Sequence, residues 1–382
     1  MTDTEQDLRA VDETDASGPV VLTKYGPVAG VQDGAIRVWK GIPYAAPPVG
    51  DLRLRAPQPV QQWSGVRDAT TYANASIQGR KGAFVRPRVY QPTSEDCLTL
   101  NITAPRAAHS APRPVVVFIH GGGYVFGTSA VSLYAGTGLA AHHDVIVVSF
   151  NYRLGVFGYV DFTDFATPDR PVDSNLGLRD QVAALEWVHR NIAAFGGDPD
   201  NVTIFGESAG AAAVTTLLAT PAAKGLFRQA IAQSSPADWA LDRTTAADFA
   251  RRCVERLDSA ADLFTADAHD LGKIAGRVSM DAMRANPGLM TMMPVIDGEF
   301  LPAHPLDAMA DGTAHPVPLI IGTNRHEGTL FAKYMDELPT NPARIEQMFD
   351  ATNVIPLQRV SSHYRDYPTE RSAIRLGGDR VF

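Results

Sequence analysis

The chain has 382 residues, 45% of them hydrophobic, which is enough for a large core, and its formal net charge is −8. No Lys/Arg-rich run stands out, so neither nucleic acid nor an anionic membrane surface is expected as a partner. The two cysteines, Cys97 and Cys253, are too few for a disulfide framework and favour a reducing, cytoplasmic setting. The longest apolar runs have only the length of strands, so no membrane insertion is expected.

The N-terminal residues 1–19 are expected to form a disordered acidic tail. They contain six Asp and Glu residues against Arg9 and have no apolar stretch typical of a signal peptide. A single domain is expected over residues 20–382. It begins with a predicted hairpin around an Asp-Gly pair at Asp33, followed by a proline-rich loop at residues 42–59.

Strands and helices are expected to alternate after residue 113, which predicts an α/β fold with a mostly parallel central sheet flanked by helices. Five short β-branched runs are typical of strands buried on both faces; they lie at residues 115–119, 145–150, 202–205, 230–233 and 317–321. The clearest helix is residues 176–195, with Ser174 or Asn175 as the expected N-cap. Residues 238–316 are mostly helical in pattern and are expected to form an excursion beside the sheet.

The motif GESAG at residues 206–210 lies between a predicted strand and a helix of small residues. This is the context of a nucleophile elbow, in which flanking glycines allow a sharp turn that exposes a serine hydroxyl. The alternative is a chance match, which the strand–turn–helix context argues against. Ser208 is therefore predicted to be a catalytic nucleophile.

A second glycine-rich motif, HGGGY at residues 120–124, follows the strand at 115–119. Consecutive glycines leave N–H groups free to face a developing oxyanion, so Gly122 and Gly123 are predicted donors together with the N–H of Ala209. A flexible loop without function is the alternative reading. A phosphate cradle is not favoured, because no Lys-Ser/Thr pair follows the glycines.

The acid of a catalytic triad is expected to follow the serine in the chain. Glu327, in GTNRHEG directly after the strand at 317–321, is the best candidate because it lies at a strand end. Asp297, in PVIDGEF, is the second candidate, although its position before Gly298 is typical of a turn residue.

These motifs together resemble the type B carboxylesterases, the family that also contains the cholinesterases. The resemblance runs from about residue 20 to the end of the chain and is carried by GIPYAAPPVGDLRLRAPQP, SEDCLTLNI, VVVFIHGGGYVFG, VSFNYRLGVFGY, NLGLRDQVAALEWVHRNIAAFGGDPDNVTIFGESAG, PVIDGEFLP and GTNRHEGTLF. It implies an α/β-hydrolase fold and hydrolysis of small-molecule esters without metal or cofactor.

The resemblance also implies roles for single residues. Glu327 falls on the triad acid of the family, while Ser234 falls on a supporting buried serine and Glu207 is expected to support the nucleophile beside it. Glu95 and Arg153 fall on positions expected to form an ion pair. The Cys97 position often forms a disulfide in the family, but here no partner cysteine is present upstream, so a buried free thiol is expected.

The catalytic histidine departs from the family pattern. Of the ten histidines, only His363 follows Glu327, and its helical surroundings are typical of a surface residue. His326 precedes the acid and therefore has the wrong chain order. We expect the C-terminal part of the domain to be missing, with the base beyond residue 382 and the 382 residues nearly inactive by themselves.

Three functions are consistent with the sequence at this stage. The leading one is a serine-dependent carboxylic ester hydrolase that works through an acyl-enzyme. A catalytically inactive binding module is the second, and the intact Ser208 and Glu327 argue against it. The third is a related acyl hydrolase for amides, carbamates or thioesters, which uses the same chemistry in a different pocket.

Overall fold

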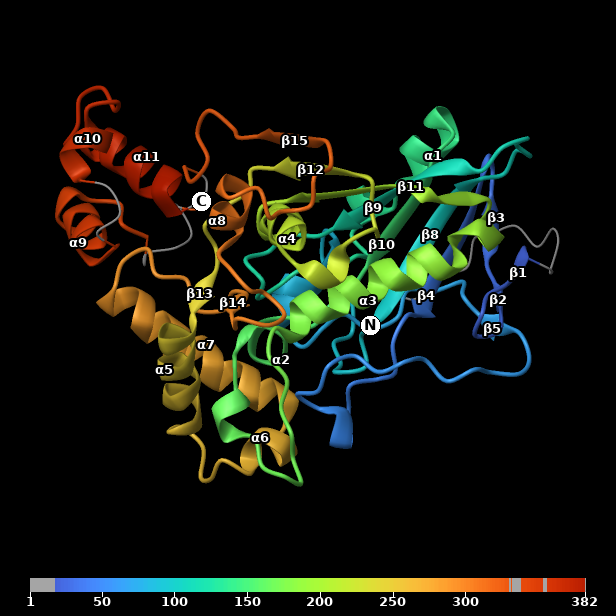
Figure 1. Cartoon of the computed structure of the whole chain (residues 1–382), viewed down its shortest axis with the longest axis horizontal. Coiled ribbons are helices and arrows are strands. Elements are labelled where there is room, and N and C mark those ends of the chain that lie inside the picture. Colours follow the sequence, from blue (N-terminus) through green and yellow to red (C-terminus); the bar gives the residue numbers. More distant parts are fainter. Residues whose placement is uncertain (1–17, 330, 332–337, 353–355, 382) are drawn as a thin grey trace, which may run out of the picture.

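The computed structural model describes residues 18–329, 331, 338–352 and 356–381, so the predicted acidic tail lies almost wholly outside the described residues. Its centre is an eight-stranded sheet in the order β15-β12-β11-β9-β10-β8-β4-β3 (Figure 1). The strands, from one edge to the other, are Leu319–Gly322, Gln229–Gln233, Gly197–Glu207, Arg113–Ile119, Ile146–Phe150, Thr99–Pro105, Ile36–Pro43 and Val31–Asp33.

All five predicted apolar runs are strands of this sheet. β9, β10, β11, β12 and β15 pair in parallel, whereas β8, β4 and β3 continue the sheet in antiparallel pairs. Every residue of β10 is buried, as expected for a strand covered on both faces. Because parallel strands end at the same edge, the loops that follow β9, β11, β12 and β15 come together there.

Two long helices cover one face of the sheet. α3 (Leu176–Asn191) continues into a 3₁₀ turn, η5 (Ile192–Phe195), and α4 (Ala209–Leu218) packs on β11, β12 and β9. Asn175 occupies the predicted N-cap position of α3, but its side chain makes no capping hydrogen bond. Asn175 adopts a left-handed conformation and its side chain donates to the carbonyl of Val295, while Ser174 donates to Asp297. Both side chains hold a distant loop rather than the first turn of the helix.

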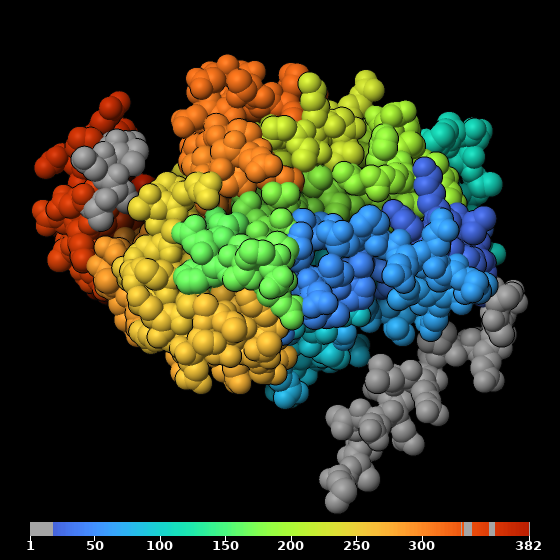
Figure 2. Space-filling view, turned by 60° about the horizontal axis from the view of Figure 1, so that its bottom comes forward, coloured from blue at the N-terminus to red at the C-terminus, as the bar shows by residue number. Residues whose placement is uncertain are grey.

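The excursion after β12 lies beside the sheet in Figure 1. Its elements are β13 (Leu241–Asp242), α5 (Arg243–Val254), α6 (Asp262–Thr265), α7 (Ala268–Ala285), β14 (Val295–Ile296) and α8 (Pro305–Ala310). In that view, α5, α6 and α7 lie below α4, and α8 lies next to α4. α7 packs on α5 and on α2 (Gly155–Tyr159), and Figure 2 shows that the excursion forms a continuous surface with the N-terminal third of the chain.

Three C-terminal helices form a small layer of their own at the far side of the excursion (Figures 1 and 2). They are α9 (Pro342–Thr352), α10 (Leu357–Ser361) and α11 (Glu370–Val381). Their core is separate from the main one and contains Leu338, Ile345, Met348, Phe349, Ala373, Leu376 and Val381. The indole of Trp239 donates to the carbonyl of Val381 over 3.1 Å, and Arg380 pairs with Asp238, so α11 is tied to the excursion.

The remaining elements lie in loops around the sheet. They are β1 (Val20–Leu22), β2 (Pro27–Ala29), β5 (Arg67–Asp68), β6 (Phe84–Arg86), β7 (Val89–Tyr90), α1 (Thr137–His143), η1 (Gly50–Leu52), η2 (Arg80–Ala83), η3 (Ser132–Tyr134), η4 (Thr163–Phe165) and η6 (Pro221–Ala223). The predicted hairpin is the antiparallel pair β3–β4, with Asp33 opposite Ile36. No helix in the described ranges is both long enough and apolar enough to cross a membrane.

The predicted ion pair between Glu95 and Arg153 was wrong, because each residue has another partner. Arg153 binds the buried Asp180 of α3 through two nitrogens, at 2.7 and 2.8 Å. Glu95 instead receives two hydrogen bonds from Arg53. The expectation of a free thiol at Cys97 is confirmed; it is fully buried, and burial raises its pKa to about 12.

Candidate active site

The site begins at the turn between β11 and α4, where Ser208 is the single residue between strand and helix. Its backbone adopts φ 57° and ψ −126°, which is strained for a residue with a side chain. The N–H of Ser208 donates to the carbonyl of Gln233, the last residue of β12, over 3.0 Å. The turn is thus fixed to the neighbouring strand, and its hydroxyl lies at the carboxyl edge of the sheet.

Glycines on both sides of Ser208 are required by close packing. A Cβ atom on Gly210 would overlap the carbonyl oxygen of Ile119, and one on Gly206 would overlap the backbone of Gly210. Any other residue would therefore push α4 away from the end of β9. The two glycines let the first turn of the helix begin against the strand ends, which is what a nucleophile elbow needs.

The glycine-rich loop after β9 lies directly on this turn. A Cβ atom on Gly121 would be 3.2 Å from Cβ of Ser208 and 2.5 Å from the carbonyl oxygen of Glu207. The loop turns back at Gly122, whose carbonyl accepts from the N–H of Phe126 over 3.1 Å and whose φ is 115°. In the described part of the chain, the N–H groups of Gly122, Gly123 and Ala209 donate to no protein acceptor.

These free donors suit an anionic oxygen next to Ser208. Ala209 is the first residue of α4, so its N–H lies at the positive end of the helix dipole. Gly122 and Gly123 belong to the loop that contacts the serine. The three residues were predicted as an oxyanion hole; Ala209 follows Ser208 directly, and Gly122 and Gly123 follow Gly121, which packs against Ser208.

The predicted acid, Glu327, follows β15 and is connected to Ser234 through Asn324. The side-chain amide of Asn324 donates to Oγ of Ser234 over 2.9 Å and to Glu327 over 3.4 Å, and its N–H also donates to Glu327. The N–H of Glu327 in turn donates to Asp379 of α11. Asn324 was not predicted, although its position three residues before the acid in the same loop is a signal that sequence reasoning could have used.

The pKa of Glu207, which precedes Ser208, responds to the charge of Glu327. Burial, and after it the negative charge of Glu327, raise the pKa of the Glu207 carboxyl above its usual value. Such a charge effect acts only over short distances in a partly buried region. Hydrogen bonds link the same residues, because Asn324 donates to Glu327 and to Ser234, which directly follows Gln233, the acceptor of the Ser208 N–H.

A family model described as the carboxylesterase family matches residues 17–373. The chain belongs to the carboxylesterase family. It is 44% identical over 319 residues to the para-nitrobenzyl esterase of Bacillus subtilis (strain 168), covering 82% of this chain and 63% of that protein. It is 40% identical over 336 residues to the cocaine esterase of Homo sapiens, covering 84% and 58%. The chain thus spans about three fifths of the length of these relatives.

Solved structures of carboxylesterases confirm the α/β-hydrolase fold. A thermophilic PNB esterase superimposes with a TM-score of 0.85 at 38% identity, covering 95% of this chain and 74% of that one. A carboxylesterase of Geobacillus stearothermophilus gives a TM-score of 0.80 at 38% identity with the same coverage. The mostly parallel sheet flanked by helices is therefore the architecture that the sequence predicted.

In this carboxylesterase-family chain, His120 packs beneath the glycine-rich loop and contacts its backbone at Gly121. Its ring stacks on Tyr152 at 4.6 Å between centroids, and Nδ1 lies 2.9 Å from the carbonyl of Gly121. The hydroxyl of Tyr152 also donates to the carbonyl of His120. Burial lowers the pKa of His120 to about 4, and the Gly121 contact offsets this only in part. His120 is thus a neutral ring that shapes the loop.

The second acid candidate, Asp297, is occupied by its own loop. Burial alone would raise its pKa, but hydrogen bonds from Ser174, Asn175 and two backbone N–H groups outweigh burial and lower it. These contacts join the start of α3 to the turn at residues 297–301. The arrangement is that of a turn residue, as its sequence context indicated.

None of the ten histidines, all of which are described, hydrogen-bonds Ser208 or Glu327. His363 contacts the carbonyl of Arg359 and the hydroxyl of Ser362 on the exposed side of α10. His326 is exposed beside the acid. Ser208, the predicted oxyanion donors and the predicted acid therefore lie towards one edge of the sheet, and no described histidine takes the place of a general base.

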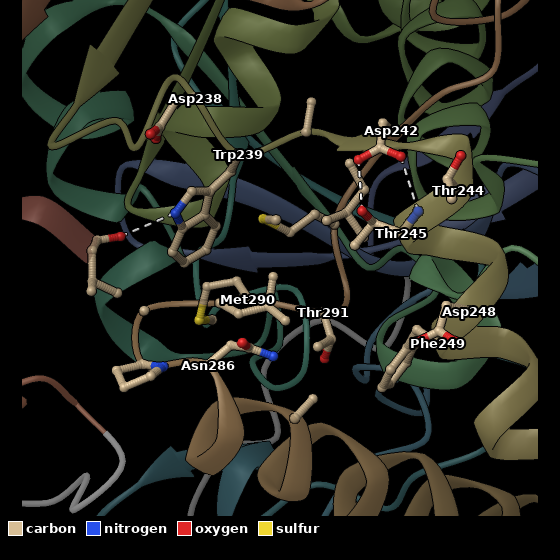
Figure 3. Close-up of a pocket in the computed structure, with 18 of the residues that line it drawn as sticks. Asp238, Trp239, Asp242, Thr244, Thr245, Asp248, Phe249, Asn286, Met290 and Thr291 are labelled. Carbon is tan, nitrogen blue, oxygen red and sulfur yellow. Dashed lines mark hydrogen bonds between the residues drawn. The ribbon is translucent and has the colours of Figure 1, made fainter. Parts of the chain in front are cut away.

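A cavity of about 540 Å³ lies between α5, the end of α7 and the C-terminal end of α11, and is shown in Figure 3. Trp239 stands at its edge, with its ring centroid 6.2 Å from that of Tyr124 in the loop. Three carboxylates line this cavity, and each has a partner. Asp242 caps α5 through Thr245, Asp248 pairs with arginines of the same helix, and Asp238 pairs with Arg380.

Proposed function

We propose that the protein is a serine-dependent carboxylic ester hydrolase that acts through an acyl-enzyme. The observation that carries this proposal is the strained turn at Ser208 with the free N–H groups of Gly122, Gly123 and Ala209 around it. The names of the relatives, para-nitrobenzyl esterase and cocaine esterase, support ester hydrolysis as the chemistry. The substrates proposed are small-molecule esters.

In the first half of the reaction, Oγ of Ser208 attacks the ester carbonyl while a base removes the hydroxyl proton. The carbonyl oxygen becomes an oxyanion and accepts hydrogen bonds from the three backbone donors, which are already in place before the reaction. The ester C–O bond then breaks, the alcohol leaves with the proton held by the base, and the acyl group stays on Ser208.

In the second half, the same base removes a proton from water, which attacks the acyl-enzyme through a second oxyanion. Breakdown of this intermediate returns the proton to Ser208 and releases the carboxylic acid. Glu327 would orient the imidazole of such a base and stabilise it while it is charged. Asn324 and Ser234 hold the carboxylate of Glu327 in position for this task.

Because no described imidazole contacts Ser208, we propose that the 382 residues by themselves hydrolyse esters only at a residual rate. An unassisted serine hydroxyl is a weak nucleophile at neutral pH. A cytoplasmic location is also part of the proposal and is supported by the two free, buried thiols of Cys97 and Cys253. An inactive binding module is not favoured, because the nucleophile, donors and acid are all intact.

The proposal is tested by mixing the protein with p-nitrophenyl butyrate and quenching the reaction in acid within seconds. Mass spectrometry should find the butyryl group on the peptide that contains Ser208. If the base is the missing component, added imidazole should increase p-nitrophenol release by the 382-residue chain. Release without any acylated serine, or acylation at another residue, would contradict the mechanism.

A further inference from the structure

A large cavity of about 830 Å³ lies between Val125 at the end of the glycine-rich loop, α2 and α7. Val125 of the oxyanion loop and Gly155 at the start of α2 both line it, and the N–H of Gly155 donates to the carbonyl of Tyr124. Its wall is largely apolar and rich in methionine, consisting of Ile77, Val125, Val156, Met280, Met283, Met290 and Met292. Flexible thioether chains adapt to apolar ligands of differing shape.

The rim of this methionine cavity is strongly cationic. Its basic residues are Arg80, His269, Lys273, Arg277 and Arg284, and the single acid that lines it is Asp281. Asp281 already pairs with Arg256 and Arg284, and Lys273 pairs with Asp270. Among the described residues, Arg80 and Arg277 have no carboxylate partner, so their positive charges remain uncompensated at the rim.

The neighbouring segment adds to this positive charge. Residues 79–90 contain Arg80, Lys81, Arg86 and Arg88 and no acidic residue, although the whole chain carries a net charge of −8. The segment rests on the oxyanion loop, since a Cβ atom on Gly82 would be 2.6 Å from Cβ of Phe126. Arg80 also lies over the ring of Tyr90, 5.3 Å from its centroid. An anion that approaches Ser208 from this side meets a local excess of positive charge.

Ordinary surface arginines are solvated and need no ligand. Here, however, uncompensated guanidinium groups border an apolar cavity of ligand size that opens against the oxyanion loop. An apolar chain would fill the cavity, and an anionic end would reach the rim. Guanidinium groups are suited to a carboxylate because their planar N–H donors match both of its oxygens.

We infer that the preferred substrates are esters that carry a carboxylate at the far end of an apolar segment, an inference that rests on the esterase function proposed above. The apolar segment occupies the methionine cavity, and the carboxylate binds Arg277 and Arg80. Both arginines are specificity residues, distant from the bond that breaks, so their loss affects the choice of ester and leaves the chemistry intact.

Binding is measured in the Ser208→Ala variant of the full chain, so that no turnover occurs. The two probes are hexananilide and the monoanilide of hexanedioic acid, which differ by the terminal carboxylate. Calorimetry should show about tenfold tighter binding of the carboxylate probe, and this preference should shrink in high salt. The added substitutions Arg277→Gln and Arg80→Gln should each reduce the preference, and together they should bring it within twofold of unity.

Arg228→Gln is the matched control, because Arg228 is exposed at the opposite end of β12 and should leave the preference unchanged. Equal affinity for both probes in the Ser208→Ala protein, or an unchanged preference in the double-arginine variant, would overturn the inference. A protein that also contains the catalytic base allows the same preference to be measured by turnover. The quantity is the ratio of kcat/KM for the mono-p-nitrophenyl ester of hexanedioic acid to kcat/KM for p-nitrophenyl hexanoate. Failure to cleave the neutral ester would count against the esterase function, whereas the binding result addresses the carboxylate preference alone.

Discussion

The two sides of the proposed active site are built in different ways. On the nucleophile side, Ser208 and the oxyanion loop are fixed by backbone contacts between buried strand ends, including the close approach of Gly210 to Ile119. On the acid side, Glu327 follows an exposed edge strand in which Ile320 and Ile321 are 68% and 52% exposed. Its position depends on side-chain contacts with Asn324 and Asp379.

The conformation of the nucleophile side is thus determined locally, by one strand, one turn and one helix that pack against the neighbouring strand ends. The acid side is an exposed loop whose geometry depends on residues from three separate segments. Substitutions on the first side should therefore act through chemistry or through global stability. Substitutions on the second should act through the orientation of one carboxylate.

The largest effect is expected from removing the nucleophile. Ser208→Ala should abolish covalent labelling by a fluorophosphonate probe and lower kcat of the active protein by about 10⁶-fold, on the scale seen when a serine protease loses its serine. Ser110→Ala, an exposed serine in a loop, serves as the control and should label normally. Labelling that persists in Ser208→Ala would show that the well-packed side does not hold the nucleophile.

The next largest effect is expected on the acid side. In a protein that also contains the base, Glu327→Gln keeps the shape of the side chain but removes the charge that holds and stabilises an imidazolium, so kcat should fall by roughly 10⁴-fold. Asp297→Asn should instead lower the free energy of unfolding, because Asp297 accepts four hydrogen bonds, and should change kcat little. The opposite pattern in steady-state kinetics and denaturant unfolding would exchange the two roles.

The pH dependence of stability should separate the sides further. His120 is fully buried with a pKa of about 4, below its ordinary 6.5. As the pH falls, this imidazole therefore becomes protonated at a higher pH in the unfolded chain than in the folded protein. Its contribution to stability is therefore present above pH 6.5 and is lost as the pH falls towards 4, a change of about 3 kcal/mol. Chemical unfolding of His120→Gln should lack this part of the pH dependence, while the exposed control His189→Gln keeps it.

A smaller effect is expected from the bridge between Ser234 and the acid. Asn324→Ala removes the donors that orient Glu327, so kcat should fall by about tenfold, roughly 1.4 kcal/mol, with little change in KM. Ser234→Ala combined with Asn324→Ala should cost less than the sum of the single effects, since the two side chains act as one unit. Additive losses would mean that Ser234 and Asn324 position the site independently.

The sequence predicted the strands and the strand–turn–helix geometry at Ser208 well, because both depend on short-range patterns. The β-branched runs specify buried strands wherever the sheet places them. In GESAG, the glycines at 206 and 210 indicate positions where the turn leaves no room for a Cβ atom. The oxyanion donors followed from the same reasoning, since consecutive glycines after β9 were expected to meet the elbow. These predictions needed only the order of strand, turn and helix.

The mistaken and missing predictions all concern contacts between distant segments. The partners of Arg153 and Glu95 depend on where α3 places Asp180 and where the proline-rich loop places Arg53. Asn175 was expected to cap its own helix but binds residues 120 positions away. The cationic segment at residues 79–90 was not predicted as a binding element, because only the folded chain places Arg80 beside the methionine cavity.

The indole of Trp239 gives the molecule a built-in optical reporter. Its ring centroid is 6.2 Å from that of Tyr124 in the glycine-rich loop, and its N–H donates to the carbonyl of Val381 at the end of α11. Its emission should therefore respond both to an occupied oxyanion loop and to loosening of the C-terminal helices. Replacing the other three tryptophans by phenylalanine would isolate the fluorescence of Trp239. Substrate binding and fraying of the C-terminal helices could then be followed by the emission of one residue.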